Sequence, residues 1–292
     1  MNVIFQISGG IGKSILSTAV CKAIKKKYPN DKLIVVTGYP DVFTNSKDVD
    51  MAFAFGQEGY FYTKYVENQD VLIMALEPYM VTEHIKGQEH LIETWCKLCD
   101  VPYNGEQPEV FINERERSFY AEKYRSDKPI FLIQTNGGAD QQGLKYSWAR
   151  DIPRHVVEAV INEFKDQYNI VHIKREDQYG FDGTFAVTDN YKGIAVLIEM
   201  SEKRLFMDSF AQHTAAGLNK PSTVLWIANT PDVFGYKVHD NILANPFTAK
   251  GDLKNSYFSK FNITGALEEF PYNNELEIFD VEKVLTSLRK IL

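Results

Sequence analysis

The chain has few cysteines, no long apolar run and no excess of positive charge, and each absence excludes a class of protein. Its 292 residues include 3 Cys, too few for a disulfide framework and typical of a reducing compartment. No segment approaches the ~18 apolar residues that a membrane-spanning helix needs. The formal net charge of -7 argues against general binding of polyanions, although a local basic patch stays open.

The first residues and the cysteine spacing remove two further classes. MNVIFQISGG has neither a basic region nor a long apolar stretch, so we expect no signal peptide and a cytoplasmic protein. Cys96 and Cys99 form a CxxC, but no second pair follows. Because the surrounding LIETWCKLCDV has a helical pattern, we expect both thiols to pack in the core rather than to serve metal or redox chemistry.

What is present is a repeated β/α pattern, in a chain long enough for two domains of roughly 150 residues. NVIFQI leads through the glycine loop SGGIGKS into a helical stretch, and the strand KLIVVT follows. This is a βαβ unit, which predicts a parallel sheet with a right-handed crossover. VLIMAL (71–76) is a further strand, and we expect a helix over about 87–99.

The pattern restarts after the charged stretch NERERSFYAEKYRSDK. Strands are expected at PIFLIQT, NIVHIK and STVLWIA, and helices at IPRHVVEAVINEFKDQY, over most of AVLIEMSEKRLF and from DSFAQH onward. We therefore predict an α/β protein of two Rossmann-like domains that face each other across a cleft, residues 1–125 and 126–270, with a boundary near 120–128. The amphipathic stretch FDVEKVLTSLRKIL predicts a helix within 271–292, and we expect it to return to the N-terminal domain, as terminal helices of two-block folds often do.

Ligands of such sheets bind outside the carboxyl ends of the strands. The segments expected at the cleft are Ser8–Ser14, Gly38–Phe43, Glu77–His84, Asn136–Lys145, Lys174–Asp177 and Met207–His213.

The glycine loop by itself has two interpretations. It is similar to the phosphate loop of ATPases, because glycines and a Lys-Ser at a helix N-terminus can surround a phosphate. However, the GxxxxGK[ST] pattern has Ile7 in its first place, and the variant KGGxGK[ST] has Ser8 instead of Lys. The other interpretation is a tight turn that only lets helix and strand approach closely.

The second block carries the stronger resemblance. DSFAQHTAAGLNKPSTVLW (208–226) resembles the DSGxxHLAAALGKPVVALF stretch of the heptosyltransferase-like glycosyltransferases, the family of ADP-heptose:LPS heptosyltransferases. LIEMSEKRLFMDS has the spacing of that family's LIxxADLFVGNDS. The strand–loop–helix segment from PIFLIQT has Lys145 and Trp148 at the places of the family's KxWP. GGIGKSILSTAVCKAIKKKYPNDKLIVVT and EHLIETWCKLCDVPY are similar to its acceptor-domain segments, so the resemblance covers most of residues 1–230.

This resemblance implies a GT-B fold, an acceptor bound by the first domain and a nucleotide-diphosphate sugar bound by the second, with inversion and no required metal or cofactor. A leaving diphosphate then needs cations, hydroxyls and helix N-termini. The implied donor-site residues are Gly9, Gly10, Gly12, Asn136, Gly137, Gly138, Lys145, Glu176, Asp208, Ser209 and His213. Four of them also have a structural interpretation: capping for Asp208 and Ser209, core packing or capping for His213, and a solvated loop for Lys145.

Two positions depart from the family. Its DSG glycine is Phe210, and its catalytic acid, which directly follows the glycine of the first loop, is Lys13. A lysine near phosphates stays protonated and cannot take the proton of an acceptor hydroxyl. The candidate bases at strand ends are Asp41, Glu77 and His84, and we expect Lys13 to contact a phosphate or carboxylate of a bound ligand.

Three functions follow from these observations. The first is transfer of a sugar to a hydroxyl of a glycan, with a lipid-linked glycan, a protein or a modified nucleobase in DNA as other acceptors. The second is a P-loop-type ATPase with a deviant phosphate loop. The third is a sugar-nucleotide-binding protein that keeps the fold and has lost the acid.

Overall fold

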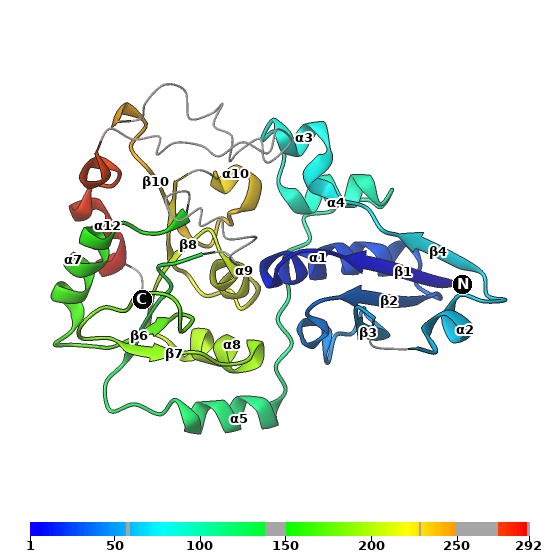
Figure 1. Cartoon of the computed structure of the whole chain (residues 1–292), viewed down its shortest axis with the longest axis horizontal. Coiled ribbons are helices and arrows are strands. Elements are labelled where there is room, and N and C mark those ends of the chain that lie inside the picture. Colours follow the sequence, from blue (N-terminus) through cyan, green and yellow to red (C-terminus); the bar gives the residue numbers. More distant parts are fainter. Residues whose placement is uncertain (57–58, 138–149, 228, 249–273, 291–292) are drawn as a thin grey trace.

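The structure is a computed structural model that describes residues 1–56, 59–137, 150–227, 229–248 and 274–290. It contains two parallel sheets, each with helices packed on it, in two lobes that lie side by side (Figure 1). We call the lobe built on the first sheet the first domain and the other the second domain. The prediction of two Rossmann-like α/β domains is confirmed.

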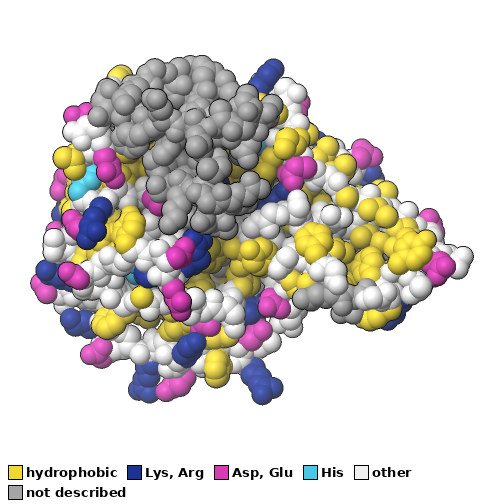
Figure 2. Space-filling model, in the orientation of Figure 1, with side chains coloured by type: hydrophobic (Ala, Val, Ile, Leu, Met, Phe, Trp, Pro, Cys, Tyr) yellow, Lys and Arg dark blue, Asp and Glu magenta, His cyan; other side chains and the backbone are white. Residues whose placement is uncertain are grey.

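The first sheet has four strands in the order β3-β2-β1-β4, all parallel. The strands are β1 (Asn2–Ile7), β2 (Lys32–Thr37), β3 (Met51–Ala54) and β4 (Val71–Met74). One face packs on α1 (Ile11–Lys27) and α4 (Leu91–Leu98). The other face is covered by the five-residue α2 (Phe61–Tyr65), so Ile73 on the edge strand β4 stays 57% exposed. Figure 2 shows hydrophobic side chains gathered on this lobe, at the right of the view.

The second sheet has six parallel strands in the order β10-β9-β8-β5-β6-β7. They are β5 (Ile130–Ile133), β6 (Asn169–Ile173), β7 (Phe185–Val187), β8 (Lys203–Met207), β9 (Thr223–Trp226) and β10 (Asp240–Leu243). On one face lie α8 (Tyr191–Met200) and α9 (Phe210–Gly217), and on the other α7 (Arg154–Phe164).

One strand of the second sheet was predicted as helix from the sequence. The stretch AVLIEMSEKRLF is a helix only as far as Met200, and from Lys203 it forms β8 in the middle of the sheet. The apolar run continues through both elements because both are buried, so periodicity does not separate them. Lys203 and Arg204 look like solvated residues in the sequence but are buried here, and they donate to the carbonyl oxygens of Leu288 and Pro221.

Short elements complete the loops at the carboxyl ends of the strands. They are η1 (Pro40–Phe43), η2 (Pro78–Met80), α3 (Thr82–Ile85), α10 (Pro231–Phe234), η3 (Pro246–Thr248) and η5 (Glu275–Glu277). Cys96 and Cys99 lie in and directly after α4, and both are buried in the core with free thiols. The prediction that they pack in the core is confirmed.

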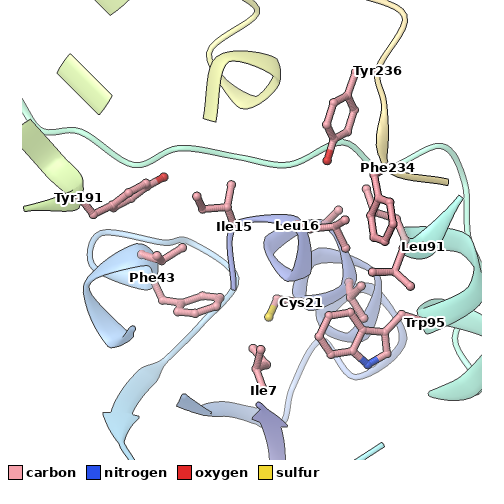
Figure 3. Packing of buried hydrophobic residues seen from close by; sticks show 14 of the residues in the cluster. Ile7, Ile15, Leu16, Cys21, Phe43, Leu91, Trp95, Tyr191, Phe234 and Tyr236 are labelled. Atoms are coloured by element: carbon pink, nitrogen blue, oxygen red, sulfur yellow. The ribbon is translucent and has the colours of Figure 1, made fainter. Parts of the chain in front are cut away.

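One apolar core cluster contains residues of both domains. Helix α1 lies between the first sheet and α9, and every residue from Lys13 to Cys21 is buried. Figure 3 shows Ile15 and Leu16 of α1 directed toward Tyr191 and Tyr236 of the second domain, while Ile7 and Cys21 lie on the side of the first sheet. The two domains are therefore packed against each other and are not independent units joined only by a linker.

The connection between the domains is also anchored. Helix α5 (Glu114–Lys123) begins with a capping box of Asn113 and Glu116 and packs beside α8 (Figure 1). From the start of α8, Lys192 is buried and donates to the carbonyl oxygens of Thr44 and Phe111. This lysine ties the second domain to the η1 loop and to the connecting segment.

The C-terminal helix corrects a second expectation. Helix α12 (Val281–Lys290) packs on α7, β8 and β9 of the second domain rather than on the first domain (Figure 1). Its apolar stripe, Val284, Leu285 and Leu288, fills the core on that face of the second sheet. The amphipathic pattern correctly predicted a helix, but it did not indicate on which domain this helix would pack.

This placement predicts the effect of shortening one buried side chain. Leu288 is 0% exposed, and Leu288→Ala should lower the free energy of unfolding by about 2–5 kcal/mol, the usual cost of a cavity at such a site. Urea unfolding followed by circular dichroism measures the change. Leu276→Ala is the control, because Leu276 is 63% exposed. Equal effects of the two substitutions would contradict the packing described for α12.

Among the described residues, no helix combines the length and the apolar character that a membrane crossing requires.

Candidate functional site

The glycine loop joins β1 to α1 at the edge between the two domains. Gly9 has a φ of +97°, a left-handed conformation that favours glycine. A Cβ on Gly12 would lie 3.3 Å from His213 Cδ2 and 3.5 Å from Phe210 Cα. Gly12 therefore lets the first turn of α1 contact the first turn of α9, whereas a Cβ on Gly10 would meet nothing within 4 Å.

Lys13 points from this first turn into the first domain. Its Nζ lies 2.7 Å from both Oε1 and Oε2 of Glu77, which follows β4, and its side chain is 4% exposed. The ammonium also lies 4.7 Å from the ring centroid of Tyr79 and 5.2 Å from that of Trp95. Burial lowers the pKa of Lys13, while the hydrogen bond and the charge of Glu77 raise it, with a net lowering.

Glu77 is bound on both oxygens but keeps a solvent-facing edge. The Ser8 hydroxyl donates to Oε2 over 3.0 Å and the Tyr79 amide donates to Oε1 over 3.2 Å. The side chain of Glu77 is nevertheless 36% exposed. The loops after β1 and β4 thus come together, because their strands are neighbours in the sheet.

The other two candidate bases lie in different surroundings. His84 in α3 is buried against the rings of Tyr79 and Phe234, and burial lowers its pKa to about 4. It is therefore a neutral imidazole near pH 7. Asp41 in η1 is exposed, and its charge acts on Lys192. Lys13, Glu77 and His84 influence one another, so the structure brings three of the four first-domain candidates together.

The second domain places its candidates around the start of α9. Asp208, at the end of β8, accepts from Asn229 Nδ2 and lies 3.7 Å from Arg150 Nε. Ser209, the residue before α9, accepts from Gln134 Nε2 over 3.0 Å. The carboxylate of Asp208 is thus already partly neutralised, and the N-terminus of α9 faces the same edge of the sheet.

His213 is held inside the interface between the domains. It is 5% exposed, its Nδ1 lies 2.8 Å from the Tyr236 hydroxyl, and burial lowers its pKa to about 3. Beside it, His90 of the first domain contacts the carbonyl oxygen of Gly235 at 3.1 Å. These contacts agree with the packing role that the sequence left open for His213.

The remaining donor-site candidates lie at the ends of β5 and β6. The Asn136 side chain and the Gly137 amide both donate to the carboxylate of Asp151, each over 3.0 Å. Burial raises the pKa of Asp151. Glu176 is exposed in the turn after β6. Gly138 and Lys145 lie outside the described residues.

Residues from both domains meet around Tyr79. Burial raises the pKa of its hydroxyl, and the charges of Arg150 and Asp208 from the second domain and of Glu77 from the first act on it. Neither Tyr79 nor Arg150 was among the site residues predicted from the sequence. Their only sequence signal was their place, within the Glu77–His84 loop and close to the KxWP-like segment.

Comparison with proteins of known structure identifies the fold. E. coli ADP-heptose LPS heptosyltransferase II superposes on this chain with a TM-score of 0.70 at 13% identity. The superposition covers 100% of this chain and 98% of the heptosyltransferase. The fold is that of the GT-B heptosyltransferases. A glycosyl transferase of family 9 from Veillonella parvula gives 0.67 at 13% identity over 99% and 96% of the two chains. E. coli heptosyltransferase WaaC with ADP gives 0.56 at 12% identity over 84% and 94%. Neither a protein-family model nor a curated protein sequence matches the chain.

Proposed function

We propose that this protein is a glycosyltransferase, which moves a sugar from a nucleotide-diphosphate sugar to an acceptor hydroxyl with inversion and without a metal. The observation that carries the proposal is the carboxylate of Glu77, which is supplied by the first domain at the edge that faces the start of α9. Inverting transfer needs a general base on the acceptor side, and a carboxylate can serve as that base. The GT-B heptosyltransferase fold supports the proposal further.

In this mechanism Glu77 replaces the acid that is missing at position 13. The Glu77 carboxylate takes the proton of the acceptor hydroxyl while the hydroxyl oxygen bonds to the anomeric carbon and the diphosphate leaves on the opposite side. The Glu77 side chain is 36% exposed, so an acceptor hydroxyl can approach it from solvent. His84 is less suited, since its ring is packed between Tyr79 and Phe234.

The second domain stabilises the leaving group. Negative charge is favoured at the N-terminus of α9, where unpaired backbone amides carry a partial positive charge. Arg150 lies next to Asp208 at this point. We propose that Asn136, Gly137 and Ser209 also face the donor, with Gly138 and Lys145 from the adjoining segment and Glu176 near the ribose. The acceptor is a glycan or another hydroxyl-bearing molecule.

The direct test is product analysis with the full chain. The protein is incubated with a panel of nucleotide-diphosphate sugars and glycan acceptors, and the nucleoside diphosphate and the glycosylated product are measured. Equimolar release of both, with inverted anomeric configuration by NMR, is the expected result. Hydrolysis of ATP in place of sugar transfer would favour the ATPase, and binding of nucleotide sugars without turnover would favour a protein that only binds them.

Transfer should not depend on a divalent metal. The donor-site segments contain no Asp-x-Asp pair, and helix-end and cationic groups take the place of a metal at the diphosphate. Turnover measured in excess chelator should therefore stay within about twofold of the untreated enzyme, a difference of roughly 0.4 kcal/mol in the barrier. A complete loss that magnesium restores would contradict the metal-free mechanism.

A further inference from the structure

Lys13 occupies an unfavourable place for a cation. It lies in the first turn of α1, where the helix end is itself positive and no acidic residue of the helix compensates. Its side chain is 4% exposed, so water does little to screen it. The compensating charge is Glu77, 64 residues further along the chain. Each of the two charges therefore depends on the other.

The contacts of Glu77 fill the positions at which it could accept a proton. A carboxylate has about four lone-pair sites. Here Oε1 accepts from Lys13 and the Tyr79 amide, and Oε2 accepts from Lys13 and Ser8. A carboxylate bound in this way must release a donor before it can take a proton from an acceptor hydroxyl.

The charged and titratable groups around the pair are few. His84 faces it from α3 and is neutral near pH 7, because burial lowers its pKa to about 4. Tyr79 of η2 lies below the ammonium, and Trp95 of α4 adds a second ring. From the second domain, Arg150 and Asp208 act on Tyr79. Within the described part of the chain, these are the groups that the structure connects to the pair.

We propose that Lys13 is a movable counter-ion, which holds Glu77 while the donor is absent and passes to the diphosphate of the donor when it binds. This inference rests on the proposed function. Gly12 brings the first turn of α1 onto Phe210 at the start of α9, so a diphosphate at α9 lies next to the turn that carries Lys13. A diphosphate offers at least two negative charges, whereas Glu77 offers one.

The consequence is a base that becomes available only when the donor is present. When the ammonium leaves, two lone pairs of Glu77 are freed. Glu77 can then accept the proton of the acceptor hydroxyl at the moment of transfer. Lys13 acts through Glu77 here and is a positioning residue.

Proton uptake on binding of ADP tests the proposal without relying on turnover. ADP serves as the probe, and calorimetry at pH 5 in two buffers of different ionisation enthalpy gives the number of protons taken up. If the ammonium of Lys13 leaves Glu77 when ADP binds, the wild-type protein should take up about 0.2–0.5 proton more than Glu77→Gln, which has no carboxylate to protonate. Subtracting the Glu77→Gln value removes the protons that ADP itself exchanges.

Two further variants complete the design. Lys13→Met removes the cation at nearly constant volume, and it should lose the extra uptake and bind ADP at least tenfold more weakly. Lys192→Met is the matched control: Lys192 is also a buried lysine, but it binds the carbonyl oxygens of Thr44 and Phe111 and should keep the wild-type uptake. Thermal unfolding of each variant verifies that it is folded.

The outcomes separate this inference from the proposed function. ADP binding with equal uptake in the wild type and Glu77→Gln overturns the movable counter-ion and leaves sugar transfer standing. Extra uptake without any sugar transfer supports the counter-ion and contradicts the transferase. Failure of the wild type to bind ADP at millimolar concentration contradicts the counter-ion for this nucleotide, and product analysis with other nucleotide sugars then decides the function separately.

Discussion

Replacing Glu77 by Gln should lower kcat for sugar transfer by about 10²–10⁴-fold, the usual contribution of a positioned general base. The amide keeps the shape of the side chain and can still accept from Ser8 or Lys13 through its oxygen, but it cannot take a proton. Because the donor binds to the second domain in the proposed mechanism, donor affinity should change far less than kcat. Initial rates at saturating donor and acceptor measure the effect.

The chain offers a closely matched control for this substitution. Glu109 is also paired with a lysine of α1, Lys22, and its side chain is 33% exposed compared with 36% for Glu77. Glu109→Gln removes a comparable charge from a different lysine pair of α1 and should leave kcat unchanged. A Glu77→Gln protein that retains wild-type kcat would remove Glu77 as the base, and Asp41 and His84 would be the next residues to replace.

Replacing Trp95 by Ala should lower the free energy of unfolding by about 3–5 kcal/mol, the range for loss of a buried aromatic side chain. Trp95 is 0% exposed, and its ring meets Phe5 edge-on at 5.2 Å between centroids. It also covers one side of Lys13. Guanidinium unfolding monitored by circular dichroism gives the change in stability.

Two further substitutions serve as controls for the change in stability expected of Trp95→Ala. Trp95→Phe keeps an aromatic ring and should cost distinctly less than Trp95→Ala. Phe119→Ala removes an aromatic side chain that is 63% exposed on α5, and it should change the stability by less than about 0.5 kcal/mol. A cost below 1 kcal/mol for Trp95→Ala would contradict the central place of this residue in the core.

The architecture could be predicted because its signals are local. A strand, a glycine turn and a helix adjoin in residues 2–27, and this order recurs in the second block, so the two parallel sheets follow from the order of the elements. The strand β8 was wrongly predicted as helix, and it contains two consecutive charged residues in the centre of a sheet. Lys203 and Arg204 are tolerated there because carbonyl oxygens from distant segments bind them, and a sequence does not show such partners.

The candidate site could be predicted only in part, for the same reason. Glu77 could be named as a candidate base because it follows a strand, and the carboxyl ends of parallel strands meet at one edge of the sheet. Its pairing with Lys13 joins residues that are 64 positions apart, and the approach of Arg150 to Asp208 depends on how two loops of the second domain are arranged. The role of Gly12 was open for a similar reason, since its contact with Phe210 lies on another domain.

The core shared by the two domains also restricts how the domains can move relative to each other. Opening the lobes as a hinge would expose the apolar surface around Ile15 and Leu16, which lies between α1 and the second domain, and would cost roughly 25 cal/mol for each Å² uncovered. Sliding α1 along α9 keeps those side chains covered. The packing thus favours a shear motion of small amplitude over a wide hinge opening.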